Sequence, residues 1–101
     1  MTRDQFIQML VLDGFPDPVL VEREAGGFLG DHAHPFEVKA LVISGQIDLV
    51  IDGKRSSYIS GEAFHLSANQ VHAEQYGSKG VQYLASRKNI SDGNSSISSV
   101  D

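Results

Sequence analysis

Two histidines one residue apart, His32 and His34, are the residues of this chain best suited to chemistry. Successive side chains of a β-strand point to opposite faces, so two imidazoles at this spacing share one face and can present nitrogen ligands to one divalent cation. The chain has four histidines and no cysteine, which excludes disulfides, thiolate metal sites and a cysteine nucleophile. A His-X-His pair also occurs without function, and a third histidine on a neighbouring strand is what would give the pair weight.

The elements that must position these side chains are mostly short strands. Thr2 and Gln5 form a capping-box pattern, which predicts a short amphipathic helix over residues 3–12. From Val19 onward the helical period disappears, and turn residues such as Asp52-Gly53 separate β-rich segments. We expect strands over residues 19–24, 37–44, 46–51, 55–60, 63–66, 71–76 and 81–86. Strands at this spacing predict an antiparallel sandwich or barrel.

Size and charge narrow the class of protein. The 101 residues suffice for one domain, and the net charge of −5 argues against a nucleic-acid or anionic-membrane partner. The densest basic spots, Lys54-Arg55 and Arg87-Lys88, are interpreted as solvated surface. No apolar run approaches a membrane span, and the start MTRDQF lacks the pattern of a secretory signal, so a cytoplasmic protein is expected.

The spacing of glycines and histidines resembles two motifs of the cupin superfamily. Gly26, then His32-Ala33-His34, then Gly45 is similar to the first motif. Gly61, then Ser67-Ala68-Asn69, then His72 is similar to the second, with Ser67 and Asn69 where that motif usually has Pro and Gly. The resemblance covers about residues 19–86 and implies an all-β fold, a double-stranded β-helix barrel like a jelly roll, with the short helix added at the N-terminus. The barrel domain is expected over residues 1–88, followed by a serine-rich flexible tail over 89–101.

Membership of this superfamily also implies a site. His32, His34 and His72 would converge as ligands of a divalent metal ion, which could be Zn, Ni, Fe, Mn or Cu, in the mouth of the barrel. A small-molecule ligand is the implied partner. A homodimer is also expected, because residues 40–43 are apolar on both faces of their predicted strand.

One position departs from the family pattern. The first motif normally supplies a Glu where this sequence has Val38. The neighbouring Glu37 should point outward by the two-residue period, unless a bulge near Pro35 turns it inward as an alternative ligand. Glu74 alternates with His72 and Tyr76 on one predicted strand, so all three should face the same way. Glu74 is therefore a candidate fourth ligand or general base, with Tyr76 as a possible proton donor. Otherwise three histidines form the site with water or substrate, and Glu74 supports them through a salt bridge or hydrogen bond.

The other residues near the two motifs are expected to have structural roles. Phe36, Val38 and Leu66 are expected to form an apolar pocket wall, and His65 is expected on the outside of the barrel. Three functions remain open. The chain is a metal-dependent oxygenase, isomerase or lyase acting on a small organic acid or carbonyl compound, a non-catalytic module that binds or senses a small molecule, or a structural barrel with relic histidines.

Overall fold

The computed structural model describes residues 1–89 and contains one helix followed by six strands. These are α1 (Arg3–Leu12), β1 (Val19–Arg23), β2 (Phe28–His32), β3 (Phe36–Ile51), β4 (Lys54–Ile59), β5 (Ala63–Leu66) and β6 (His72–Asn89). The helix predicted over residues 3–12 is confirmed, with the Thr2 and Gln5 capping box formed. Asn89 is the last residue of β6, and the rest of the predicted tail, residues 90–101, lies outside the described residues.

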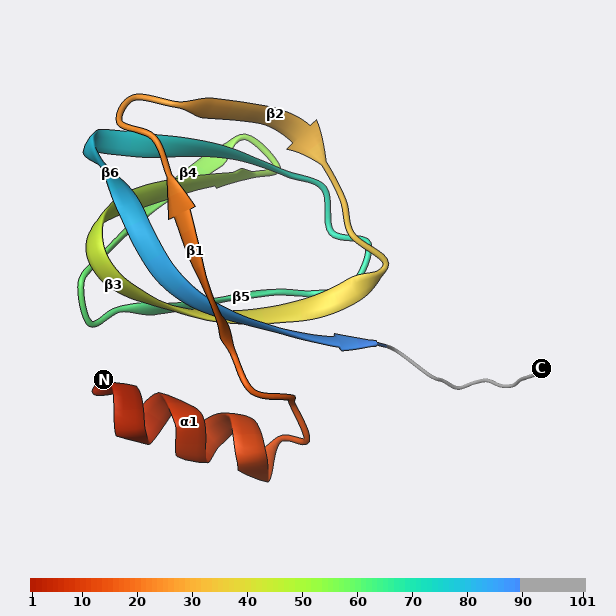
Figure 1. Ribbon diagram of the computed structural model, residues 1–101. Coiled ribbons are helices and arrows are strands. Elements are labelled where there is room, and N and C mark those ends of the chain that lie inside the picture. The colour runs from red at the N-terminus through yellow and green to blue at the C-terminus, as the bar shows by residue number, and fades with distance from the viewer. Residues whose placement is uncertain (90–101) are drawn as a thin grey trace.

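Two long antiparallel strands, β3 and β6, form the frame of the fold. They pair with each other over most of their length. Where the end of β3 meets the start of β6, β4 and β2 add to the two free edges. Where the start of β3 meets the end of β6, β5 and β1 do the same. The sheet bends so that these two four-stranded halves face each other and form an all-β barrel (Figure 1).

The bends make two continuous strands of what the sequence predicted as four. The β3–β6 register shifts between Val42 and Ser44 and again between Gly45 and Ile47, so the chain turns without leaving the sheet. Gly45 makes this possible, since it has a φ of +79° and a Cβ added there would lie 2.1 Å from the carbonyl oxygen of Gly80. The prediction of a strand break at this position was therefore wrong, because the glycine marks a bulge and a close backbone approach.

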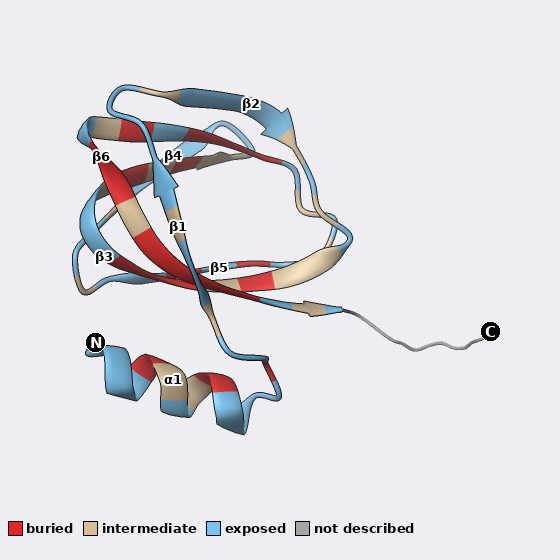
Figure 2. Ribbon diagram, in the orientation of Figure 1, coloured by how far each residue is buried: buried red, intermediate tan, exposed pale blue. Residues whose placement is uncertain are grey.

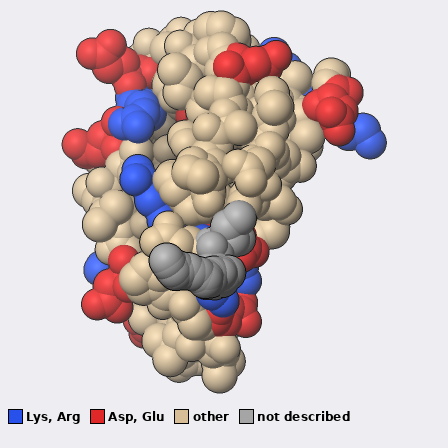
Figure 3. Space-filling model, turned by 90° about the vertical axis from the view of Figure 1, so that its right-hand side faces the viewer, with Lys and Arg blue, Asp and Glu red and all other residues tan. Residues whose placement is uncertain are grey.

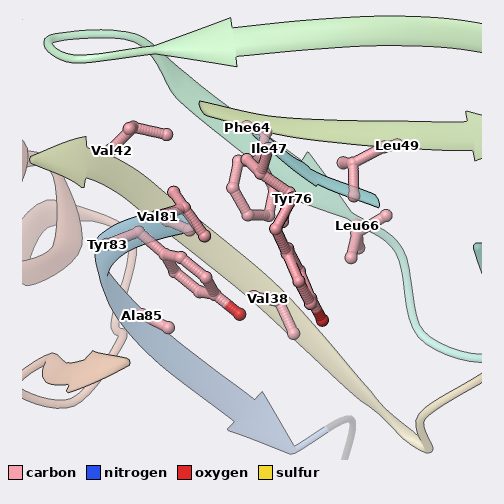
Figure 4. Packing of buried hydrophobic residues seen from close by; sticks show 11 residues of the cluster. Val38, Val42, Ile47, Leu49, Phe64, Leu66, Tyr76, Val81, Tyr83 and Ala85 are labelled. Atoms are coloured by element: carbon pink, nitrogen blue, oxygen red, sulfur yellow. The ribbon is translucent and has the colours of Figure 1, made fainter. Parts of the chain in front are cut away.

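The inside of the barrel is apolar. Figure 4 shows this cluster, with the hydroxyl groups of Tyr76 and Tyr83 both pointing towards Val38. Its buried members are Val38, Ala40, Val42, Ile47, Leu49, Phe64, Leu66, Tyr76, Val81, Tyr83 and Ala85.

The helix covers part of the outside of the barrel. Phe6 and Leu10 of α1 pack with Phe15 against Leu41 of β3 and Leu84 of β6. Figure 2 shows the buried residues of α1 on the side nearest the barrel, while β2 is largely exposed. The helix thus supplies the second apolar contact of residues 40–43 within one chain, so this pattern no longer requires a partner subunit. Within residues 1–89, no helix is long and apolar enough to cross a bilayer.

Candidate metal centre

Three histidines from separate parts of the chain meet at one end of the barrel. His32 ends β2, His34 lies in the connection to β3, and His72 begins β6 beside His32 in the register. These ends lie together at the right of Figure 1. One ring nitrogen of each histidine lies within 4.8 Å of the other two. The convergence implied by the resemblance is therefore present, although His32 and His34 do not share one strand.

The register explains how that pair converges without a regular strand. The pairing of β2 with β6 shifts between Leu29 and His32, and Pro35 follows His34 before β3 begins. The irregular backbone turns both imidazoles to the same side, and their ring centroids lie 5.0 Å apart. The two-residue period correctly predicted that His32 and His34 face the same way, but it assumed one regular strand, which the structure does not have at these residues.

Backbone carbonyls hold the rings of His32 and His72 in one tautomer. Nδ1 of His32 lies 2.7 Å from the carbonyl oxygen of Gly30, and Nδ1 of His72 lies 3.0 Å from that of Gln70. A carbonyl only accepts hydrogen bonds, so each Nδ1 carries the hydrogen and donates it. The Nε2 lone pair of each neutral ring is then free for a cation, the arrangement that metal-binding histidines use.

The Nε2 atoms of these two rings lack suitable partners. Nε2 of His32 is buried and has no hydrogen-bond partner among the described residues. Its nearest acid, Glu74, has Oε2 at 3.4 Å without hydrogen-bond geometry. The same Oε2 lies 3.2 Å from Nε2 of His72, which places an acceptor against a lone pair. A cation among these atoms would satisfy all three, so the donor set fits a divalent metal ion.

His34 completes the donor set from the exposed side. Burial lowers the pKa of His34 below its ordinary value of 6.5, and the neighbouring His32 and His72 lower it further. The neutral ring, the form that binds metal, is thereby favoured. His34 also stacks on Phe36 with ring centroids 4.9 Å apart, which restricts its orientation.

Glu74 and Tyr76 form a buried pair beside the histidines, on the same side of β6 as His72. The Tyr76 hydroxyl donates to Oε1 of Glu74 over 2.9 Å. Burial raises the pKa of Tyr76 to about 12, and the hydrogen bond and charge of Glu74 add to this effect, so Tyr76 keeps its proton at neutral pH. Both residues predicted as catalytic therefore lie next to the triad.

Comparison with solved structures connects this geometry to a known fold. The amino-acid sequence itself matches no family model and no curated protein. The structure resembles an RmlC-like cupin from Shewanella frigidimarina, with a TM-score of 0.61, 18% identity, 69% of this chain covered and 62% of that one. It also resembles a cupin superfamily protein from Desulfitobacterium hafniense, with a TM-score of 0.63, 14% identity and coverage of 70% and 64%. This chain has the cupin fold.

A third similar structure supports the same fold. An uncharacterised protein with a double-stranded β-helix domain from Klebsiella pneumoniae aligns with a TM-score of 0.59 and 22% identity, covering 70% of this chain and 66% of that one. The sequence prediction of a small cupin barrel with an N-terminal helix is confirmed. The chain spans about three fifths to two thirds of the length of these structures.

The pocket of this barrel opens beside the triad. It is a cavity of about 110 Å³ in which His32 and His34 line one part and apolar side chains line most of the rest. Phe36, Val38 and Leu66 belong to this wall, as predicted. Val38 lines the pocket at the position where the first motif usually has Glu, so this position supplies an apolar side chain and no carboxylate.

Two charged residues that line the pocket were not predicted as pocket residues from the sequence. Arg23 of β1 and Arg87 of β6 both line the pocket, and both are exposed, as predicted for Arg87. The two-residue period could have indicated these positions, because Arg23 follows Val21 and Arg87 follows Ala85 on the face of the strand that lines the pocket. Assigning that face required knowing which side of each strand faces the barrel interior.

The remaining histidine lies elsewhere. His65 of β5 is exposed and its Nε2 contacts a carboxylate oxygen of Glu37 on the outside of the barrel. This confirms that His65 is separate from the triad. It also shows that Glu37 points away from the pocket, so the alternative in which Glu37 is a metal ligand does not match the structure.

Proposed function

We propose that this cupin binds one divalent transition-metal ion through His32, His34 and His72 and acts on a small organic acid or carbonyl compound. The observation that carries the proposal is the fixed orientation of His32 and His72: Nε2 of His32 has no hydrogen-bond partner among the described residues, and Nε2 of His72 faces the acceptor oxygen of Glu74. Three imidazoles at this spacing have no structural purpose in an apolar barrel. Zn, Ni, Fe, Mn and Cu all accept nitrogen ligands of this kind.

The chemistry would belong to the oxygenase, isomerase or lyase classes. A doubly charged ion held by three neutral imidazoles supplies Lewis acidity and open positions. Glu74 is the carboxylate nearest to the triad and acts in this proposal as general base, while Tyr76 holds its second oxygen and keeps a proton available. The apolar wall excludes water from the reacting end of the ligand.

Metal analysis tests the first step. Protein purified without a histidine tag is expected to contain close to one metal ion per chain, or to take up one zinc ion on titration. A content far below one, together with a melting temperature that does not respond to Zn, Ni, Mn or Fe(II), would refute the metal site.

The role of Glu74 has its own test. Glu74→Gln keeps the side-chain volume and removes the charge. If Glu74 is a base, the variant binds zinc with nearly unchanged affinity and loses turnover. If Glu74 is a fourth ligand, the variant loses zinc affinity as well.

A non-catalytic binding module is the second candidate. If His72 instead donates from Nε2 to Oε2 of Glu74, while the Tyr76 hydroxyl donates to Oε1, both oxygens are engaged and Glu74 is not free to act as a base. In that case a small ligand binds beside the metal and is released unchanged. Dioxygen consumption and substrate turnover across a panel of small acids and carbonyl compounds separate the two candidates.

We also propose that the protein is cytoplasmic and forms a homodimer. β1 is an edge strand with exposed apolar side chains, Val19 at 60% and Leu20 at 55%, and such an edge can pair with a second copy. Light scattering at micromolar concentration tests the dimer, and a monomeric mass would refute it.

A further inference from the structure

We propose that Arg23 and Arg87 bind the carboxylate of a small organic acid at the mouth of the barrel. This inference deepens the proposed function by naming which residues recognise the acidic group of the ligand. It depends on the pocket beside the triad being the ligand site, but not on which reaction follows.

The fold places both arginines, which are exposed, at the edge of the pocket that they line. Arg23 ends β1 opposite Val81, and Arg87 lies opposite Val38 near the end of β6. Both side chains line the cavity that His32 and His34 also line. The guanidinium of Arg87 lies 4.9 Å from the ring centre of Phe36, which in turn stacks on His34. The cation–π contact with Phe36 thus holds the charge of Arg87 at the rim of the pocket, close to His34 of the triad.

The charges of both arginines also reach the inner wall. Burial and the charge of Glu74 raise the pKa of Tyr83, whereas the positive charges of Arg23 and Arg87 lower it. Tyr83 therefore lies within the electrostatic reach of both guanidinium groups. The two arginines act on one pocket although they belong to different strands.

Neither guanidinium forms a salt bridge with any residue that the structure describes. Arg23 donates to the carbonyl oxygen of Glu22, whereas Arg55 outside the pocket pairs with Asp48 at 2.9 Å. Among the described residues, Glu74 is the single acidic side chain of the pocket wall, and Tyr76 already donates to it. This pocket is thus rich in positive charge within a protein of net charge −5.

The surface around the pocket gives no sign of a polymeric anion. Figure 3 shows the face at the right of Figure 1, where small groups of positive and negative side chains lie next to one another around broad uncharged areas. The described residues visible on this face form no continuous basic band of the kind that tracks a nucleic-acid backbone.

The size of the cavity limits the ligand. The cavity is small, with a volume of about 110 Å³. The buried part of a ligand therefore has only a few heavy atoms. An organic acid with its carboxylate on the arginines and its short carbon chain against Val38 and Leu66 satisfies both the charge and the apolar wall.

Calorimetric titration of malonate into wild type, Arg23→Gln, Arg87→Gln and Arg55→Gln tests the inference, with metal-free and zinc-loaded protein measured separately. Arg55→Gln is the matched control, because it removes the same charge outside the pocket. Malonamide, the uncharged analogue, and inorganic phosphate are the comparison probes. Each pocket substitution is expected to weaken malonate binding about tenfold or more in both forms, and the control to leave it unchanged within about twofold.

Three results would overturn the inference: pocket variants that bind malonate like wild type, malonamide that binds metal-free protein as tightly as malonate, or phosphate that binds more tightly than malonate. Arginine-dependent binding by a protein that takes up no zinc would support the inference and refute the proposed metal function. If Arg87→Gln does not fold, Arg87→Lys takes its place. The lysine keeps the charge and loses the two-pronged contact, so several-fold weaker binding is expected from it.

Discussion

Replacing His72 by glutamine should remove most of the response of this protein to zinc. His72 is 1% exposed, and its Nδ1 donates to Gln70 while its Nε2 faces His32 and Glu74. Glutamine keeps a polar side chain of similar size but offers no imidazole nitrogen at that point. The substitution therefore tests the ligand without opening a large cavity.

The expected magnitude follows from linkage between binding and folding. A ligand at a hundred times its Kd stabilises a protein by about 2.7 kcal/mol, which for a domain of this size raises Tm by about 10–20 °C. Losing a residue that merely orients a ligand costs about 10–100-fold in affinity, so losing a ligand should cost at least about 100-fold. At the same zinc concentration the stabilisation then falls to about 0.4 kcal/mol, a Tm shift of about 2–3 °C.

The loss of the hydrogen bond to Gln70 adds a baseline effect. It should lower the free energy of unfolding of metal-free protein by about 1 kcal/mol and its Tm by about 4–8 °C. Thermal melts with and without zinc separate this term from the loss of metal binding. Because the quantity compared is the zinc-dependent shift in Tm of each variant, a changed baseline does not affect the comparison.

His65→Gln is the matched control, since it makes the same substitution at an exposed histidine outside the triad. It should retain the full zinc response. The reasoning is wrong if His72→Gln keeps a shift close to that of wild type, or if His65→Gln loses its shift as well.

Three further predictions concern the helix, the bend and the protonation of the site. Phe6→Ala should lower the free energy of unfolding by about 3 kcal/mol without changing zinc affinity, because Phe6 is buried between α1 and the outside of the barrel. Gly45→Ala should cost more than about 3 kcal/mol, whereas Gly53→Ala, also at positive φ but with nothing within 4 Å, should cost about 1 kcal/mol in denaturant unfolding. The lowered pKa of His34 means that the unfolded chain takes up a proton first, so metal-free protein should lose stability as the pH falls from 6.5 through the lower folded-state pKa.

Each of these has a result that would contradict it. Weaker zinc binding by Phe6→Ala would mean that the helix contact and the site are coupled. Equal costs at Gly45 and Gly53 would show that the close approach to Gly80 is unimportant. A pH dependence of stability below 6.5 that is identical in wild type and His34→Gln would remove His34 as its source.

Much of the site could be predicted from residue spacing, and the misses have a common cause. The resemblance to the cupin motifs implied the triad His32, His34 and His72, and the two-residue period then placed Glu74 and Tyr76 on the face of His72. Arg87 is exposed as predicted, but its place in the pocket wall was missed, and the strands were divided at Gly45, because both predictions depended on local composition alone. Their actual places depend on contacts between residues far apart in the chain, Arg87 over Phe36 and Gly45 against Gly80.

The amino-acid sequence by itself determined the class of fold, since alternation and turn residues are local properties, and its resemblance to the cupin motifs supplied the set of candidate ligands. Only the tertiary structure decided that the three histidines meet and that two arginines line the same pocket. It also decided that Glu74 faces His72, whereas Glu37 turns outward and contacts His65. The physical reason is the pairing of β3 with β6. The bends of these two strands bring residues of distant segments to one end of the barrel, and strand periodicity alone contains no information about that end.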